Sequence, residues 1–282
     1  MTTSRGAGAA MSATITMRAH AIVENARNAI MVLLRAPPVR SARLIPAWRR
    51  HLVRGAIAAV VVALAMILVD QRAYQFASGL PQWLVDGFYA ITDFGRSGWI
   101  LVPTGGLILI VALLASPALE HMTRGVLAML VVRIGFIFIA VGLPGLLVTI
   151  VKRWIGRVRP SAQGPFAYEP FSWRPEYASL PSGHTTTAFA ALVAIGAVFP
   201  RARPFLWGYA LLIAASRIVV TAHYASDVIA GAAVGAFGAL LVRDWFARRR
   251  LGFVVGSDGA VHALPGPSSS RIKRVARALI AP

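Results

Sequence analysis

The stretch SRIVVTAHYASD, residues 216–227, places an arginine, a histidine and an aspartate between two apolar segments. An ionisable side chain at bilayer depth costs of order 3 kcal/mol or more, so it usually persists where it faces a polar cavity and has a function. On a helix, His223 and Asp227 share one face because they are four residues apart. The carboxylate can then keep one imidazole nitrogen protonated and leave the other free to attack an electrophile. The same pattern is also compatible with a plain polar helix end.

Two further polar patches supply groups that suit a phosphate. The segment KRWIGRVRP, residues 152–160, carries Lys152 and Arg159, and Arg217 of the first stretch adds a third cation. A phosphoryl group in transfer spreads negative charge over three oxygens, so its catalysis depends mainly on positioned positive charge. Three cations from three separate segments therefore indicate phosphoryl chemistry.

The segment PSGH, residues 181–184, precedes an apolar run and is expected at a helix N-terminus. Backbone N–H groups at such a terminus bind anions, so Ser182 and the N–H of Gly183 are candidate phosphate ligands. The glycine also lets the backbone approach the ligand closely. His184 would protonate a departing alkoxide, because an imidazole titrates near neutral pH. One nucleophile, one acid and three cations suffice for phosphomonoester hydrolysis without a metal.

Each patch also has a structural interpretation. Lys152 and Arg159 could be ordinary interfacial anchors. His184 could be a plain residue of a first helical turn, and His223 with Asp227 could be a structural pair at a helix break. The joint occurrence of all three patches disfavours these readings. In addition, only two of the 29 basic residues are lysines, and one of them occupies the first motif.

The composition indicates that the elements carrying these patches lie in a membrane. Of the 282 residues, 57% are hydrophobic and 14% are charged, whereas soluble domains are about 45–50% apolar and about 25% charged. Since a membrane helix needs roughly 20 mostly apolar residues, we expect an all-α membrane protein with a six-helix transmembrane bundle. The chain has no cysteine, which excludes disulfides and cysteine-based metal sites. The predicted spans are about 52–69, 98–116, 126–151, 185–199, 204–221 and 226–246.

Basic segments flank this apolar core at both ends. Residues 1–51 are predicted to form a basic cytoplasmic arm, either an interfacial amphipathic helix or a disordered segment. The six-helix domain would occupy 52–246, and 247–282 would be a basic cytoplasmic tail with a short hairpin and an amphipathic helix. An even number of spans and arginine-rich ends place both termini in the cytoplasm. The net charge is +19, but aromatic residues do not alternate with these arginines, which disfavours nucleic acid as a partner.

The connection between the third and fourth predicted spans breaks the positive-inside rule. This connection, residues 152–184, would lie outside although it is strongly basic. A basic external loop requires a reason, and a phosphate ligand is one. With this topology the end of the third span, the start of the fourth and the junction of the fifth and sixth lie on the same external side. The three patches are therefore expected to converge there.

Taken together, K-x6-RP, PSGH and SR-x5-H-x3-D resemble the signature of the type 2 phosphatidic acid phosphatase family. Every signature position is matched, and the resemblance covers roughly residues 55–245. It implies six core helices, an active site at the outer membrane face, and hydrolysis through a phosphohistidine intermediate with no metal or other cofactor. By motif position it implies His223 as the nucleophile, Asp227 as its orienting acid and His184 as the general acid. The implied phosphate ligands are Lys152, Arg159, Ser182, Gly183 and Arg217.

We therefore expect an integral membrane lipid-phosphate phosphatase of a bacterial inner membrane, with the bilayer and a lipid phosphate as its partners. Phosphatidate, phosphatidylglycerol phosphate, undecaprenyl diphosphate and the phosphate of lipid A are all candidates, because the motif residues touch only the phosphate. Two alternatives stay open: a lipid-to-lipid phosphotransferase using the same phosphohistidine, and a non-enzymatic lipid-binding protein. A degenerate site should lack a motif histidine or arginine, and none is missing. The sequence does not indicate an oligomeric state.

Overall fold

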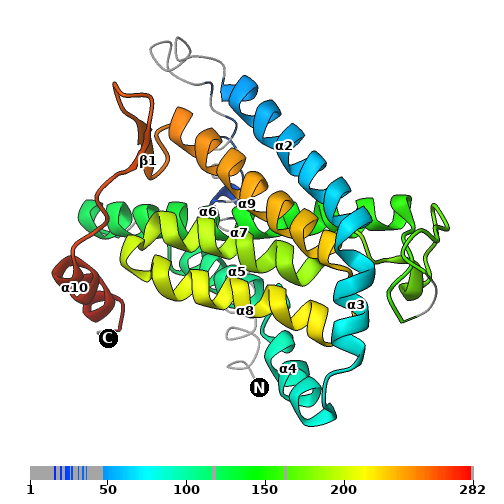
Figure 1. Cartoon of the computed structure of the whole chain (residues 1–282). Helices are drawn as coiled ribbons and strands as arrows, with labels where there is room; N and C mark the ends of the chain where they lie inside the picture. Colours follow the sequence, from blue (N-terminus) through cyan, green and yellow to red (C-terminus); the bar gives the residue numbers. More distant parts are fainter. Residues whose placement is uncertain are drawn as a thin grey trace, which may run out of the picture. The chain divides into compact units, whose positions relative to one another are not determined.

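Helices make up most of the chain (Figure 1). The computed structural model describes residues 47–115, 119–161 and 164–280, together with a few residues between 16 and 36. Most of the predicted N-terminal arm, and with it the predicted interfacial helix, lies outside the described residues. The chain divides into two compact units, one of Met1–Ala42, Thr104–Gly135 and Phe246–Pro282, the other of Arg43–Pro103 and Phe136–Trp245. All the motif residues belong to the second unit.

The helices follow one another with short connections, except for the long loop before α7 and the segment with two strands between α9 and α10. In chain order they are α2 (Ala47–Leu68), α3 (Asp70–Ser78), α4 (Gln82–Asp93), α5 (Gly98–Leu114), α6 (His121–Ile155), η2 (Pro175–Tyr177), α7 (Gly183–Val198), η3 (Pro200–Ala202), α8 (Arg203–Val219), α9 (Ala225–Arg248) and α10 (Ser269–Ile280). Two short strands, β1 (Phe253–Val255) and β2 (Val261–Ala263), lie between α9 and α10.

Each of the six predicted spans corresponds to a helix: α2, α5, α6, α7, α8 and α9. Four helical stretches of the described chain are long and apolar enough to cross a membrane, namely His51–Leu68, Gln82–Leu114, His121–Ile155 and Ala225–Arg248. The helices α7 and α8 have 16 and 17 residues, which corresponds to about 25 Å at 1.5 Å per residue. The protein is thus a helical membrane protein, while the number of six spans stays a prediction.

The surface of α2 shows why this fold requires lipid. Large apolar side chains such as Ile57, Leu64 and Ile67 are more than half exposed along the helix. A contiguous apolar surface of this kind is an association or aggregation site in water, whereas lipid tails solvate it as well as other apolar side chains do. The outer helix surface is therefore adapted to the bilayer.

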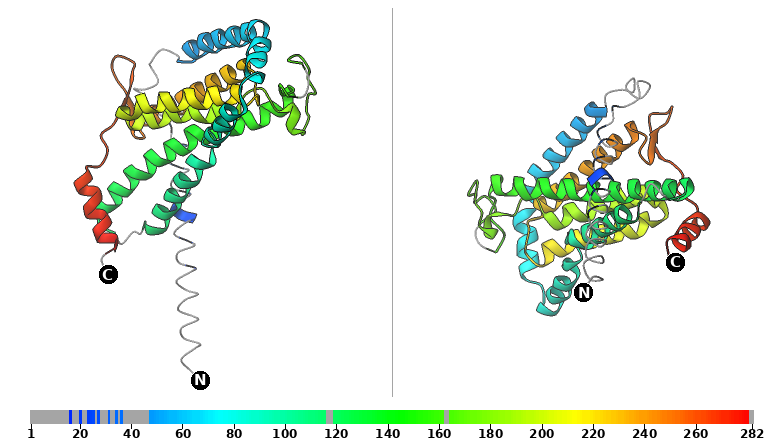
Figure 2. Two further views of the ribbon diagram at one scale, coloured as in Figure 1. Left: turned by 60° about the horizontal axis from the view of Figure 1, so that its bottom comes forward. Right: turned by 180° about the vertical axis from the view of Figure 1, so that it is seen from behind.

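The centre of the second unit is the helix pair α7 and α8, which the short η3 segment connects. Ala188 and Leu192 of α7 pack against Ala210 and Ile213 of α8, and Ile91 of α4 covers this cluster. Figure 2 shows the two helices side by side from two further directions. Because small and large apolar residues face each other here, the pair forms a rigid base for the polar ends of both helices.

Two glycines bring α9 close to α7. A Cβ atom on Gly231 would lie 2.5 Å from the carbonyl oxygen of Ser182, and one on Gly235 would overlap the carbonyl oxygen of Thr186. A Gly-xxx-Gly spacing of this kind allows helix backbones to approach closely in membranes. The first turn of α7, where the PSGH motif lies, is therefore held against α9.

The C-terminal tail is ordered in the first unit. At the place where the sequence predicts a hairpin, β1 and β2 pair antiparallel, with Val254 opposite His262. The predicted basic amphipathic segment forms α10, and its Val275 is buried against Val126 and Leu127 of α6. One apolar position of α10 therefore packs on protein rather than on lipid.

Candidate active site

The three motif patches meet where α6 and α8 end and α7 and α9 begin. The amine of Lys152, near the end of α6, lies 3.6 Å from the position that a Cβ atom on Gly183 would occupy. The N–H of Ser182 donates a hydrogen bond to the carbonyl oxygen of Asp227 at 3.0 Å. These contacts join the first patch to the second and the second to the third. The structure therefore brings together segments that are about 70 residues apart in sequence.

His223 lies in the turn that precedes α9, and not on the helix with Asp227 as the sequence reasoning assumed. Helix α9 begins at Ala225, so Asp227 stands in its first turn and accepts a hydrogen bond from the N–H of Tyr224 at 3.0 Å. A carboxylate that reaches back in this way stabilises a helix start. The spacing still brings the pair together, since Nδ1 of His223 is 3.7 Å from Oδ2 of Asp227.

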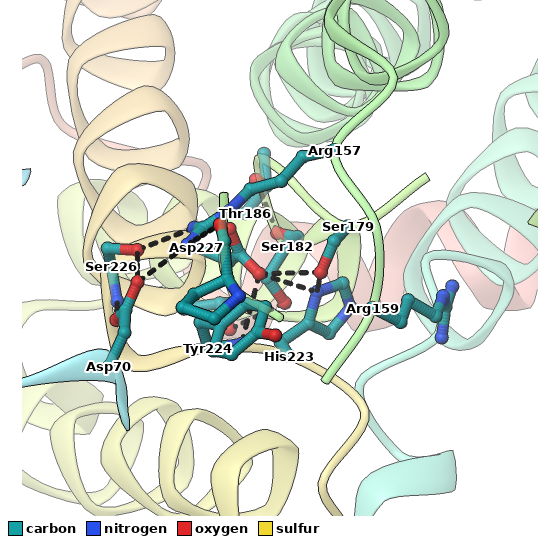
Figure 3. Close-up of polar contacts among 12 residues, drawn as sticks. Asp70, Arg157, Arg159, Ser179, Ser182, Thr186, His223, Tyr224, Ser226 and Asp227 are labelled. Carbon is teal, nitrogen blue, oxygen red and sulfur yellow. Dashed lines mark hydrogen bonds and ion pairs between the residues drawn. The ribbon is translucent and has the colours of Figure 1, made fainter. Parts of the chain in front are cut away.

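Ser179 lies between these two side chains (Figure 3). Its hydroxyl donates to Oδ2 of Asp227 at 2.6 Å and is 3.4 Å from Nδ1 of His223. A separation of 3.7 Å is too long for a direct hydrogen bond, so the serine hydroxyl connects the aspartate to the histidine. The other ring nitrogen, Nε2 of His223, forms no hydrogen bond with the part of the chain that the structure describes. That nitrogen is available for attack.

The protonation state of His223 suits a nucleophile. The residue is 3% exposed, and burial lowers its pKa from 6.5 to about 4, with the nearby Asp227 carboxylate opposing this effect and Arg217 and Arg159 adding to it. The ring is therefore neutral at pH 7. A neutral imidazole has a lone pair on one nitrogen, which is what an attack on phosphorus requires.

The three predicted cations retain unused hydrogen-bond donors. Arg217 donates from Nη1 to the hydroxyl of Thr92 at 2.6 Å, but its buried Nε has no partner in the described chain. Lys152 forms no hydrogen bond with any described residue, and the charges of Arg159 and Arg217 act on it. Arg159 donates from Nε to the carbonyl of Pro175 at 3.0 Å, and burial lowers its pKa although Asp227 opposes this. Gathered like charges with free donors indicate a site for an anion.

The N-terminus of α7 adds backbone donors to these cations. Ser182 is the buried N-cap residue, and its carbonyl oxygen accepts bonds from the N–H and the hydroxyl of Thr186 at 3.0 and 2.8 Å. The first N–H groups of a helix, here beginning at Gly183, have no partner within the helix. They carry partial positive charge and bind phosphate readily.

His184, the second residue of α7, lines a cavity of about 420 Å³. Gly95 packs directly on its ring, since a Cβ on that glycine would lie 2.8 Å from Cδ2 of His184. The positive charges of Arg217, Lys152 and Arg96 act on His184. The cavity also has polar and apolar walls, formed by Arg96, Ser97, Leu101, Gly142, Gly145, Leu146, Thr149, Gly183 and Thr187. A group bound there would lie beside both the proposed acid and an apolar surface.

A buried ion cluster that the sequence reasoning missed lies behind Asp227. Arg157 is fully buried and donates to Asp227 at 2.6 Å, to Asp70 at 2.7 Å and to Ser226 at 2.7 Å. Burial alone would lower the pKa of Arg157, but the two carboxylates outweigh this and raise it. Arg157 occupies an unspecified position of K-x6-RP, so the motif gave no reason to select it. An acid directly after the apolar run AMILV was the available signal for Asp70.

Comparison with known proteins identifies the family. The PAP2 superfamily model matches residues 133–251, which contain all three motifs. A lipid A 1-phosphatase of Rhizobium johnstonii is 38% identical over 202 residues, covering 70% of this chain and 82% of that protein. A lipid A 1-phosphatase of Rhizobium etli is 37% identical over 202 residues, covering 70% of this chain and 86% of its own.

Two solved structures resemble the fold more distantly. A transmembrane PAP2-type phosphatidylglycerolphosphate phosphatase from Bacillus subtilis is 22% identical, with a TM-score of 0.46 and coverage of 68% of this chain and 93% of that one. LpxE from Aquifex aeolicus is 20% identical, with a TM-score of 0.45 and coverage of 62% and 94%.

Proposed function

The chain belongs to the PAP2 superfamily, and we propose that it is a membrane phosphatase that removes the phosphate of a lipid phosphate through a phosphohistidine on His223. One observation supports this most: a neutral histidine with a free Nε2 and cations with unused hydrogen-bond donors lie around the same site. Neither feature stabilises the unliganded fold. Both are explained by a bound phosphoryl group.

The reaction proceeds in two balanced steps. In the first, Nε2 of His223 attacks phosphorus, the P–O bond to the lipid breaks, and the alkoxide takes a proton from the imidazolium form of His184, which becomes a neutral imidazole. In the second, water attacks the phosphorus of the phosphohistidine, the P–N bond breaks, and His184 accepts the proton of the water. Inorganic phosphate leaves, and both histidines return to their initial states. Lys152, Arg159 and Arg217 stabilise the charge on the phosphoryl oxygens throughout.

Asp227 orients the nucleophile. Its Oδ2 faces Nδ1 of His223, directly at 3.7 Å and through the hydroxyl of Ser179. The carboxylate favours the tautomer with a proton on Nδ1, which leaves the lone pair on Nε2. It also stabilises the positive charge that the ring acquires when Nε2 bonds to phosphorus.

For the substrate, we propose a lipid A-type phosphate. The curated relatives are lipid A 1-phosphatases, and the similarity covers 82% and 86% of their lengths. The cavity beside His184 would hold the leaving sugar. A second cavity of about 530 Å³, lined by apolar residues of α6 and α9 such as Leu143, Val234 and Leu241, offers space for an acyl chain. The membrane would be the bacterial inner membrane, with the site on its periplasmic face and both chain ends in the cytoplasm.

Phosphate release by the purified protein tests this function. The protein in detergent is given a panel of single lipid phosphates, including lipid A, phosphatidate, phosphatidylglycerol phosphate and undecaprenyl diphosphate. We expect release of inorganic phosphate from lipid A without any acceptor lipid. When the turnover of a ³²P-labelled substrate is quenched, we expect the protein to carry a ³²P label that is stable to alkali. Release that depends on a second lipid would instead establish a phosphotransferase.

A matched histidine pair provides the control. His262 and Asp258 of the hairpin are also four residues apart and 3.3 Å from each other, but they are exposed. We expect His223→Ala to abolish both label and phosphate release, and His262→Ala to leave them unchanged. Undiminished turnover by His223→Ala would refute the proposed nucleophile.

A further inference from the structure

The cluster of Asp70, Arg157 and Ser226 lies on the side of Asp227 away from His223 (Figure 3). We infer that Asp70 and Arg157 are positioning residues that fix the carboxylate of Asp227 and preserve its negative charge for His223. The inference rests on the proposed function, because it assigns a role within the same reaction. Asp70 lies outside the three motifs, and Arg157 occupies a position that the first motif leaves unspecified.

The guanidinium of Arg157 is fully engaged. Its Nη1 donates to Asp227 and Ser226, its Nη2 donates to Asp70, and Nη2 and Nε both donate to the carbonyl oxygen of Pro165 at 3.1 and 3.2 Å. An arginine has five N–H donors, and these five bonds match that number. A side chain held in this way is rigid and can fix the geometry of the groups around it.

Arg157 determines which oxygen of Asp227 faces the nucleophile. It binds Oδ1 at 2.6 Å, while Oδ2 accepts bonds from Ser179 at 2.6 Å and from the N–H of Tyr224 at 3.0 Å. With both oxygens occupied, the carboxylate cannot rotate without losing several buried hydrogen bonds. Oδ2 is thereby held toward His223.

Asp70 makes the net charge of this buried cluster negative. Arg157 alone would neutralise Asp227, and the pair would present no net charge to His223. Asp70 binds the same guanidinium at 2.7 Å, so the three buried groups together carry one negative charge. That charge is available to stabilise the cationic ring of the phosphohistidine. A buried ion pair alone contributes little to stability, so a third ionised group in a fully buried cluster calls for a functional explanation.

Asp70 also fixes the start of α9. It accepts hydrogen bonds from the N–H of Ser226 at 2.8 Å and from its hydroxyl at 2.6 Å. Since Asp70 is the first residue of α3, it connects that helix to the first turn of α9, which follows the turn that carries His223. The role of Asp70 can therefore be structural, electrostatic or both, and the experiment has to separate these.

Three variants make this separation: Asp70→Asn, Ser226→Ala and the double variant Asp70→Asn/Arg157→Gln. The first removes the charge and keeps the shape, whereas the second removes a hydroxyl and keeps every charge. The double variant returns the cluster to one net negative charge. The measurements are kcat and KM for phosphate release, the rate of phosphohistidine formation, and the thermal unfolding temperature of each purified protein.

We expect Asp70→Asn to lower kcat and the rate of phosphohistidine formation by about 10–100-fold, the loss common for partners that orient a site residue, with KM unchanged. Ser226→Ala should lower the unfolding temperature but keep kcat within about threefold, and the double variant should recover at least part of the lost kcat. Equal losses of kcat for Asp70→Asn and Ser226→Ala, or a wild-type kcat for Asp70→Asn, would overturn the inference. If Asp70→Asn does not fold, the double variant decides. A kcat that is reduced but measurable supports the inference, whereas a wild-type kcat would show that neither Asp70 nor Arg157 positions Asp227 and would overturn it.

Failure of the proposed function would look different. If no label is found on His223 of the wild-type protein, the proposed reaction through a phosphohistidine is refuted. If the wild-type protein carries the label on His223 and Asp70→Asn has a wild-type kcat, only the role of Asp70 and Arg157 is refuted.

Discussion

Gly231 carries no reactive group, yet we predict that its replacement by alanine disables the site. The new Cβ would lie 2.5 Å from the carbonyl oxygen of Ser182 and 3.2 Å from Cβ of Thr185. Since ordinary contacts of a Cβ begin near 3.4 Å, α9 and Ser182 must separate by about 0.9 Å. Neither is a flexible side-chain end, so the backbone has to move.

The required movement acts on the proposed phosphate ligands. The displaced carbonyl accepts both bonds of Thr186 that begin α7, and the N–H of Ser182 binds the carbonyl of Asp227. The first turn of α7, with Gly183 and His184, would therefore shift relative to the nucleophile. A misplacement of about 1 Å costs on the order of 100-fold in rate, and overpacking typically costs about 1–3 kcal/mol in stability.

Phosphate release and thermal unfolding in detergent measure the two effects. We expect Gly231→Ala to insert and fold, with kcat lowered about 100-fold and a reduced unfolding temperature. Gly208→Ala is the matched control, because that glycine of α8 has no atom within 4 Å of its Cβ position and lies outside the proposed substrate cavities. It should keep kcat within about twofold and gain roughly 0.5–1 kcal/mol from helix propensity. A Gly231→Ala protein with wild-type kcat would show that the close contact of α7 and α9 does not position the site.

Three further predictions test single steps. His184→Asn should abolish turnover of lipid phosphates but keep most of the phosphohistidine formation from p-nitrophenyl phosphate, because that leaving group needs no proton; equal loss for both substrates would contradict the acid role. Activity should survive EDTA, since three cations supply the positive charge that a metal supplies elsewhere; loss that Mg²⁺ restores would contradict this. In this cysteine-free chain, Gly164→Cys is exposed and free of clashes, and a membrane-impermeant maleimide should label it from the periplasm; labelling only after permeabilisation would reverse the topology.

The local features of this protein followed from the sequence. Apolar runs of helical length predicted the positions of α2, α5, α6, α7, α8 and α9, because helix formation in lipid depends on the hydropathy of contiguous residues. The motif spacing predicted that His223 and Asp227 meet, and they do, although through a turn and the hydroxyl of Ser179 rather than on one helical face. A separation of four residues keeps the two side chains close to each other both on a helix and in a turn that leads into a helix.

Long-range partners did not follow from the sequence. Asp70 and Arg157 are 87 residues apart, and each alone is consistent with an ordinary polar residue at the end of an apolar span. Ser179 and Thr92 likewise carry no pattern that selects them. Their roles depend on burial and on distances below 3 Å, and these arise only when the helices pack.

The sequence by itself therefore determined which polar residues are candidates to act on a phosphate and which segments form apolar helices, because composition and spacing are local properties of the chain. The tertiary structure decided how the proposed nucleophile His223 is oriented and which charges surround the carboxylate of Asp227. It did so because electrostatic coupling in a buried site depends on the positions of all neighbouring charges, and Asp70, Arg157 and Asp227 become neighbours only in the folded protein.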